Sequence, residues 1–126
     1  MRTTSASPKK AFRWRSTARS ELMTRFDVYA HPDASLRKST PFLLDVQNSH
    51  LERIATRVVI PLRAAAAIPL RTRDLNPAFT VSGRQVVADT AAMAAFPAAE
   101  LRTPVQSLAS SSGEILAALD TLFGSY

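Results

Sequence analysis

The chain has 126 residues, of which 46% are hydrophobic, and it carries a formal net charge of +6 and no cysteine. This length predicts one domain that can bury a core without cross-links, and the missing thiols exclude disulfides and thiolate metal sites. Its apolar runs are too short to span a membrane, which takes about 20 residues. We therefore expect a cytoplasmic protein that needs no metal or cofactor.

Most of the positive charge lies in the first 22 residues. This segment holds six basic residues and one acidic residue, so the rest of the chain carries ten basic and nine acidic groups. A nearly neutral body argues against a nucleic-acid-binding domain. We interpret residues 1–22 as a basic disordered arm in which Trp14 could stack on a base, or as a segment ahead of the true start at Met23.

Short apolar segments separated by polar turns predict the first strands. The first strand covers residues 26–29, and a polar loop follows over residues 31–40. The second and third strands cover residues 41–47 and 56–62. Each of these two is an apolar run with one polar insertion, which indicates that they are buried neighbours in one sheet.

The next part of the chain predicts a β-hairpin and a short turn. Residues 78–81 and 85–88 flank a Ser-Gly-Arg turn at residues 82–84, where the glycine can adopt positive φ. Residues 90–95 predict a helical turn that Pro97 ends.

The last predicted element is an amphipathic helix. Ser111 and Glu114 have the spacing of a capping box, and Gly124 is placed to end the helix. One apolar stripe follows the cap, formed by Ile115, Leu116, Leu119, Leu122 and Phe123. Strands first and one helix last predict an α+β fold, a small antiparallel barrel with a packed C-terminal helix.

Residue types with catalytic potential are sparse and scattered. His31 and His50 lie in polar loops without a metal-ligand spacing, so we expect both to be solvated. The sequence has neither a glycine-rich phosphate loop nor a GxSxG motif. Arg57 could be a ribonuclease-type cation, although an ion-pair partner at the barrel edge is the more frequent role. We expect a binding protein and not an enzyme.

Residues 23–126 resemble the CcdB family of toxins from type II toxin–antitoxin modules. The matching segments keep the order and spacing of the family: Arg25-Phe26-Asp27-Val28-Tyr29, Leu44-Asp45-Val46-Gln47, Arg57-Val58-Val59-Ile60-Pro61-Leu62, Leu75-Asn76-Pro77, and Thr90, Met93, Ala94 and Pro97. The resemblance implies an SH3-like barrel with a C-terminal helix, as in CcdB and MazF toxins, that assembles as a twofold homodimer.

The resemblance also implies a mechanism based on binding. CcdB-like toxins bind the DNA gyrase A subunit and trap the cleaved gyrase–DNA complex, so they engage DNA only indirectly, and they serve plasmid or chromosomal maintenance. A CcdA-like antitoxin is the second implied partner. The gyrase-binding positions of the family correspond here to His50, Leu51, Asp120, Phe123, Gly124, Ser125 and Tyr126. The family pattern is least well kept there, since Gly124 stands for a tryptophan of the best-known member and Ser125-Tyr126 for Gly-Ile.

Two alternatives remain open at the level of sequence. The first is a MazF-like endoribonuclease toxin, in which Thr56, Arg57 and Arg84 would face RNA. The second is a non-toxic CcdB-like protein that binds only its antitoxin.

Overall fold

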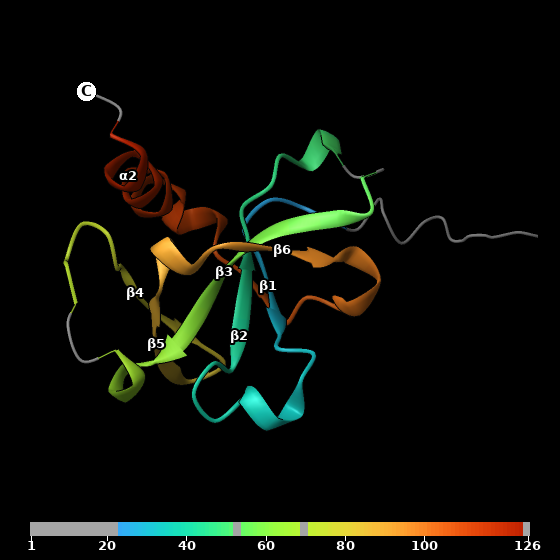
Figure 1. Ribbon diagram of the computed structural model, residues 1–126, viewed down its shortest axis with the longest axis horizontal. Helices are drawn as coiled ribbons and strands as arrows, with labels where there is room; N and C mark the ends of the chain where they lie inside the picture. Colours follow the sequence, from blue (N-terminus) through green and yellow to red (C-terminus); the bar gives the residue numbers. More distant parts are fainter. Residues whose placement is uncertain (1–22, 52–53, 69–70, 125–126) are drawn as a thin grey trace, which may run out of the picture.

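The computed structural model describes residues 23–51, 54–68 and 71–124. Within these residues, seven strands form one antiparallel sheet that curls into a nearly closed barrel, and one α-helix follows at the C-terminal end (Figure 1). The elements are β1 (Asp27–Ala30), β2 (Phe42–Asp45), β3 (Thr56–Ala64), β4 (Ala78–Val81), β5 (Arg84–Ala88), β6 (Ala94–Pro97), β7 (Gln106–Ser107) and α2 (Ser112–Phe123). The predicted α+β barrel is confirmed, while the proposals for residues 1–22 lie outside the described residues.

The long strand β3 organises the barrel because it has three neighbours. Along one edge it pairs with β2, in a register that sets Leu43 opposite Pro61. Along the other edge, residues 56–59 pair with β6 and residues 62–64 pair with β5. Pro61 therefore lies where β3 exchanges one partner for the next, which is a place where a strand tolerates a residue without an N–H.

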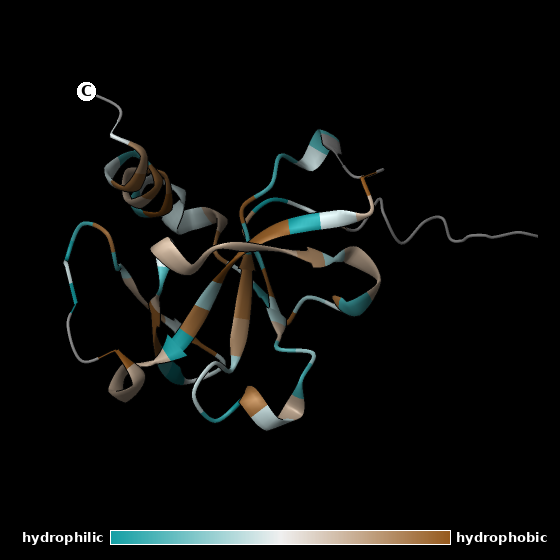
Figure 2. Ribbon diagram, in the orientation of Figure 1, coloured by the Kyte–Doolittle hydropathy of each residue, from teal (hydrophilic) through white to brown (hydrophobic). Residues whose placement is uncertain are grey.

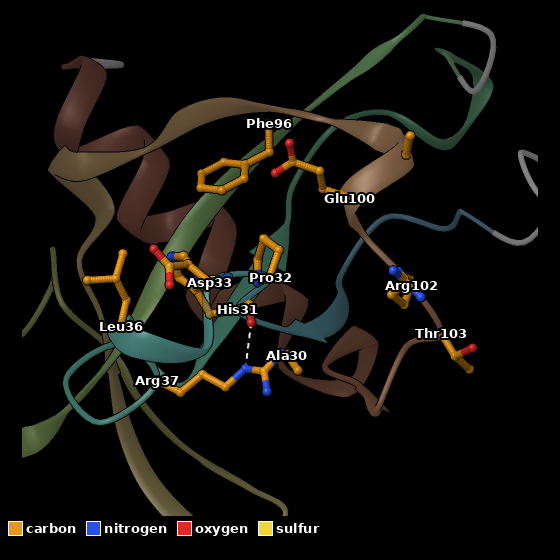
Figure 3. Close-up of a pocket in the computed structure, with 11 residues that line it drawn as sticks. Ala30, His31, Pro32, Asp33, Leu36, Arg37, Phe96, Glu100, Arg102 and Thr103 are labelled. Carbon is orange, nitrogen blue, oxygen red and sulfur yellow. Dashed lines mark hydrogen bonds between the residues drawn. The ribbon is translucent and has the colours of Figure 1, made fainter.

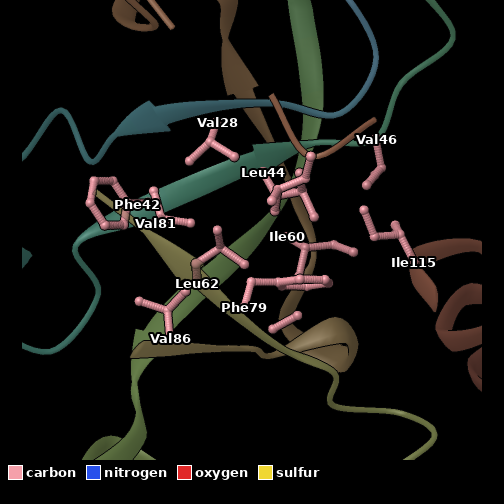
Figure 4. Close-up of a cluster of buried hydrophobic side chains, with 12 residues drawn as sticks. Val28, Phe42, Leu44, Val46, Ile60, Leu62, Phe79, Val81, Val86 and Ile115 are labelled. Carbon is pink, nitrogen blue, oxygen red and sulfur yellow. The ribbon is translucent and has the colours of Figure 1, made fainter. Parts of the chain in front are cut away.

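Both faces of the central strands are buried, which explains their nearly continuous apolar runs. The barrel interior holds the larger cluster, shown in Figure 4, with members from β1 to β5 and from α2. A second cluster covers the opposite face and consists of Met23, Tyr29, Leu43, Val59 and Leu101. In Figure 2, hydrophobic residues follow one another along β2 and the centre of β3, while hydrophilic residues are concentrated in loops and turns.

One side chain bridges the two ends of the sheet, where β4 and β7 face each other. The Gln106 Nε2 donates to the Thr80 carbonyl at 3.2 Å, and the Ser82 N–H donates to the Gln106 Oε1 at 3.2 Å. The side-chain amide of Gln106 thus replaces a strand-to-strand ladder at the seam. This bridge gives the edge strand β4 a partner without a further strand.

The β4–β5 hairpin is confirmed, with a turn one residue shorter than predicted. Arg84 already pairs with Val81, so only Ser82 and Gly83 form the turn, with φ values of 49° and 77°. Two successive positive φ angles define a type I′ turn, whose twist matches that of the flanking strands.

Two short strands went unpredicted, and one cap was predicted wrongly. Residues 94–97 form β6 because β3 offers them a free edge, although their sequence indicated a helical turn that in fact covers only 90–92. β7 has two residues, too few for a sequence pattern. Ser111 accepts no capping hydrogen bond within the described residues, because a 3₁₀ turn over 109–111 runs directly into α2.

Helix α2 packs on the barrel by a narrow face. Ile115 and Ala118 are each 1% exposed, and Ile115 belongs to the interior cluster. Leu116 and Phe123, predicted to share the apolar stripe, point outward and are 39% and 69% exposed. Among the described residues, no helix is both long and apolar enough to cross a membrane.

Candidate functional site

The loop between β2 and β3 is the first part of the candidate site. It contains the 3₁₀ turn η3 (Ser49–Leu51), which presents an exposed His50. The His50 N–H donates to the Asn48 Oδ1 at 2.8 Å, an Asx turn that fixes the local backbone. η3 is therefore a surface turn whose position depends on how its root at the end of β2 is held.

A buried ion pair holds that root. Asp45, the last residue of β2, and Arg57 of β3 are both fully buried, and their side chains meet in a bidentate contact. The Arg57 Nε donates to the Asp45 Oδ2 at 2.8 Å, and the Arg57 Nη2 donates to the Asp45 Oδ1 at 3.0 Å. Two parallel charge-assisted bonds give this contact a defined geometry.

Further hydrogen bonds carry the order from the ion pair into the loop. The Arg57 Nη2 also donates to the Gln47 carbonyl at 3.1 Å, and the Gln47 N–H donates to the Asp45 Oδ1 at 2.9 Å. In return, the Gln47 Oε1 accepts the Val58 N–H at 3.0 Å. Asp45, Gln47 and Arg57 thus provide hydrogen-bond partners for backbone groups at the point where the ladder between β2 and β3 ends. Buried polar groups require such partners.

Arg25 secures the loop from the other side. The Arg25 Nε donates to the Val46 carbonyl at 2.9 Å, and the Arg25 N–H donates to the Ser49 Oγ at 2.8 Å. The Arg25 guanidinium also lies 5.0 Å from the centre of the Phe26 ring, within cation–π range. Phe26 has a φ of 75°, which is uncommon for a bulky residue, so this corner of the barrel is tightly determined.

Burial, more than the neighbouring charges, shifts the pKa of two carboxyl groups in this network. Burial raises the pKa of Asp45 above its usual range, and the hydrogen bonds and charge of Arg57 oppose that shift. Asp27 lies on the neighbouring strand β1, where burial raises its pKa and the charge of Asp45 adds to the effect. The sequence alone did not bring these two aspartates together.

The end of α2 is the second part of the candidate site. Asp120 is exposed, and Phe123, the last residue of the helix, is the most exposed large hydrophobic side chain among the described residues. Gly124 ends the helix with a φ of 66°, and its N–H donates to the Asp120 carbonyl at 2.8 Å. Glycine suits this left-handed position best. Here Gly124 therefore has a backbone role that a larger residue would fill with strain.

The two parts are linked through the core. Val46, at the root of the loop, and Ile115 of α2 belong to the same buried cluster and lie on the same side of it (Figure 4). The structure brings Asp120, Phe123 and Gly124 together at one helix end and places His50 on a separate turn. Both segments lie in the upper half of Figure 1. Ser125, Tyr126 and the side chain of Leu51 are outside the described residues.

Two expectations about single residues need correction. Arg57 forms the predicted ion pair, but in the interior and not at the barrel edge, so it cannot face RNA as the endoribonuclease alternative requires. His31 was expected to be solvated but is only 6% exposed, because its ring packs against Phe96 of β6. His50 is exposed, as predicted.

An ion pair was predicted for Arg57, but its partner and the other positioning residues of the site were missed, although the sequence carried a signal. Single polar residues inside apolar strands are expensive to bury alone, so Asp45 and Arg57 were candidates for a mutual ion pair. Arg25 gave no such signal. Within the described part of the chain, no group of three or more His, Asp or Glu side chains is arranged to hold a metal ion.

The fold and the site together define a small β-barrel protein with one C-terminal helix and an exposed aromatic side chain at the helix end. The model of the CcdB protein family matches residues 25–124. The chain belongs to the CcdB family. No curated protein matches it. Family membership supports, as the general function, a toxin of a toxin–antitoxin system.

Proposed function

We propose that this protein binds the A subunit of DNA gyrase and traps the cleaved gyrase–DNA complex. Its contacts would come from His50 and Leu51 on η3 and from the end of α2 with Asp120, Phe123, Gly124, Ser125 and Tyr126. The protein would act by binding, without breaking bonds itself. The observation that carries the proposal is the family match over residues 25–124, joined to the exposure of Phe123 at the helix end.

The physical properties of the helix end support this assignment. The Phe123 side chain is 69% exposed and therefore contributes little to the stability of the folded monomer. Aromatic anchors of this kind dominate the binding energy of many interfaces. The left-handed conformation of Gly124 ends the helical path directly after Phe123. The exposed Asp120 carboxylate, one turn before it, adds a polar group that can fix orientation.

The direct test is a cleavage assay with purified gyrase, supercoiled DNA and ATP. We expect the full chain to accumulate cleaved DNA covalently attached to gyrase, and we expect Phe123→Ser to reduce this accumulation at least tenfold. If saturating wild-type protein traps no cleaved complex and its expression does not slow growth, the protein is a non-toxic family member.

A matched control is available on another surface. Leu36 is 45% exposed and belongs to the 3₁₀ turn η2 (Ala34–Leu36), a turn at the bottom of Figure 1, away from α2. Leu36→Ser should leave trapping unchanged if the helix end makes the contact. RNA from the same cells should remain intact, because cleavage of RNA would favour an endoribonuclease instead.

The proposed partners also include a second copy of the chain and a CcdA-like antitoxin. Leu116, on the outer side of α2, is 39% exposed and offers an apolar contact for a twofold homodimer. Light scattering on the purified protein tests the dimer. A short reading frame immediately upstream that encodes a disordered protein would identify the antitoxin, and its product should release the toxin from gyrase.

A further inference from the structure

An open cavity lies on a different surface from the proposed gyrase contacts. It has a volume of about 840 Å³ and lies between the loop over residues 31–40 and the segment that contains β6 and the 3₁₀ turn η6 (Ala98–Glu100). Figure 3 shows Leu36 and Phe96 on two of its sides and charged side chains around them. His31 also lines this cavity, and its buried ring contacts Phe96 of β6.

The environment of His31 holds it in the neutral form. The Asp33 N–H donates to the His31 Nδ1 at 3.0 Å, so this nitrogen carries a lone pair and the proton resides on Nε2. The imidazole meets the Phe96 ring edge-to-face, with the ring centres 5.8 Å apart. Only a neutral ring can accept the Asp33 bond, because a protonated ring presents a donor at both nitrogens.

The groups around His31 favour the same state. Burial lowers the pKa of His31, the charges of Arg37 on its own loop and Arg63 on β3 lower it further, and Asp33 opposes them. Arg63 is itself paired with Asp89 at 2.6 Å. From the opposite wall, Glu100 and Arg102 line the same cavity with opposite charges. No carboxylate accepts a hydrogen bond from His31 among the described residues.

Asp33, whose N–H donates to His31, also determines the conformation of the loop. The Asp33 carboxylate caps η2, accepting the Ser35 N–H at 3.0 Å and the Ser35 hydroxyl at 2.7 Å. The backbone of His31 is held in turn, since the Arg37 Nε donates to its carbonyl at 2.6 Å (Figure 3). Loss of the Asp33–His31 bond would therefore loosen the start of η2 and free Asp33 to turn toward an imidazolium.

We propose that His31 is a pH-sensitive latch that holds the 31–40 loop against β6 and releases it on mild acidification. In the neutral state the latch closes the loop over one side of the cavity. In the protonated state two N–H donors oppose each other at the Asp33 contact while the Asp33 carboxylate is still bound to Ser35, so the closed loop holds an unpaired imidazolium and opens. The surface formed by Leu36 and Phe96 then becomes wider and more accessible. This latch is independent of gyrase binding.

The sign of the pH dependence follows from the lowered pKa. A histidine that is neutral in the folded loop and has a value of about 6.5 when released binds fewer protons in the closed state. The closed state is therefore fully favoured above about pH 6.5 and loses stability as the pH falls toward the lower folded value. In that window the open population rises by up to about tenfold per pH unit.

The test uses the full chain and its two histidines. His50→Asn leaves His31 as the only histidine of the chain, and His31→Asn keeps a side-chain acceptor that cannot be protonated. We expect NMR to show the His31 imidazole in His50→Asn titrating clearly below 6.5. Amide exchange at residues 33–37, corrected for intrinsic rates, should accelerate between pH 7 and 5.5 in wild type and in His50→Asn only.

Two results would overturn the latch. One is a His31 midpoint at or above 6.5 in His50→Asn, a measurement that stays valid even if His31→Asn folds poorly. The other is an acid-induced acceleration at residues 33–37 that persists undiminished in a folded His31→Asn.

Discussion

The root of the η3 loop and the end of α2 are both parts of the proposed binding site, but they are built in opposite ways. The loop root rests on the fully buried ion pair of Asp45 and Arg57, with hydrogen bonds around it that include the half-buried Gln47 and Val58. The helix end is exposed and held mainly by its own backbone. Asp45 and Arg57 are therefore important to the site without touching a partner. They hold the loop that presents the contacting residues.

Removing the buried cation should have the largest effect on stability. Arg57→Met leaves the Asp45 carboxylate buried without its partner, so we expect a loss of about 3–5 kcal/mol in the free energy of unfolding. Urea denaturation monitored by circular dichroism measures it. Arg63→Met is the matched control, since the Arg63–Asp89 pair is 29% and 27% exposed and such pairs contribute about 1 kcal/mol or less. Equal losses of stability in the two variants would show that the buried Arg57–Asp45 pair contributes no more than the partly exposed Arg63–Asp89 pair.

The next largest effect should come from the inner face of α2. Ile115→Ala opens a cavity where the helix meets Val46, and we expect a loss of about 2–4 kcal/mol. Leu116→Ala, on the outer side of the same helix turn, should change the monomer by less than about 0.5 kcal/mol. Thermal denaturation at low protein concentration separates the two. Similar losses would mean that α2 is not docked by the narrow face described above.

A smaller effect is expected at the seam of the barrel. Gln106→Ala removes both bonds to the β4–β5 hairpin, one to Thr80 and one to Ser82, and we expect a loss of about 1–2 kcal/mol in the free energy of unfolding. Gln85→Ala serves for comparison, because the Gln85 amide donates only to the exposed Thr80 hydroxyl on the same hairpin. Hydrogen exchange of the Ser82 amide, which donates to Gln106, should accelerate in the first variant only. Unchanged exchange in Gln106→Ala would show that the seam is held by other contacts.

The smallest effect on stability should fall on the residue with the greatest proposed role in binding. Phe123→Ser should alter the free energy of unfolding by less than about 0.5 kcal/mol, because the side chain is already mostly in water. The same urea titration measures it. A loss above about 2 kcal/mol would mean that Phe123 supports the fold. A failure of Phe123→Ser to trap gyrase would then not identify Phe123 as a binding contact.

The sequence predicted the parts of the fold that follow from local patterns. The apolar runs of β2 and β3, the glycine in the β4–β5 turn and the apolar face of α2 each carry their structure in a few adjacent residues. β6 could not be found this way, because its strand conformation comes from the free edge of β3. The Gln106 bridge is likewise invisible, since it joins residues 24 and 26 positions apart.

The same limit applied to the candidate site: features set by local sequence were predicted, and features set by distant partners were not. The exposure of His50 and the position of Gly124 at the helix end agreed with expectation. The burial of His31 did not, because a polar local sequence gives no sign of Phe96, which arrives from β6 to cover the ring. Partners brought together by topology decide burial, and a single sequence does not display them.

The double partnership of β3 also has a consequence for how the chain folds. β5 and β6 pair with different parts of one strand, and β6 pairs with a segment about 40 residues earlier in the chain. Such non-local pairings slow folding, because the intervening chain must close a loop before any contact forms. We expect β2 and β3 to associate first, since only the loop between them separates their ends. β5 and β6 would then pair with the free edge of β3. A mutation in β3 would then lower the folding rate, whereas one in β6 would mainly raise the unfolding rate.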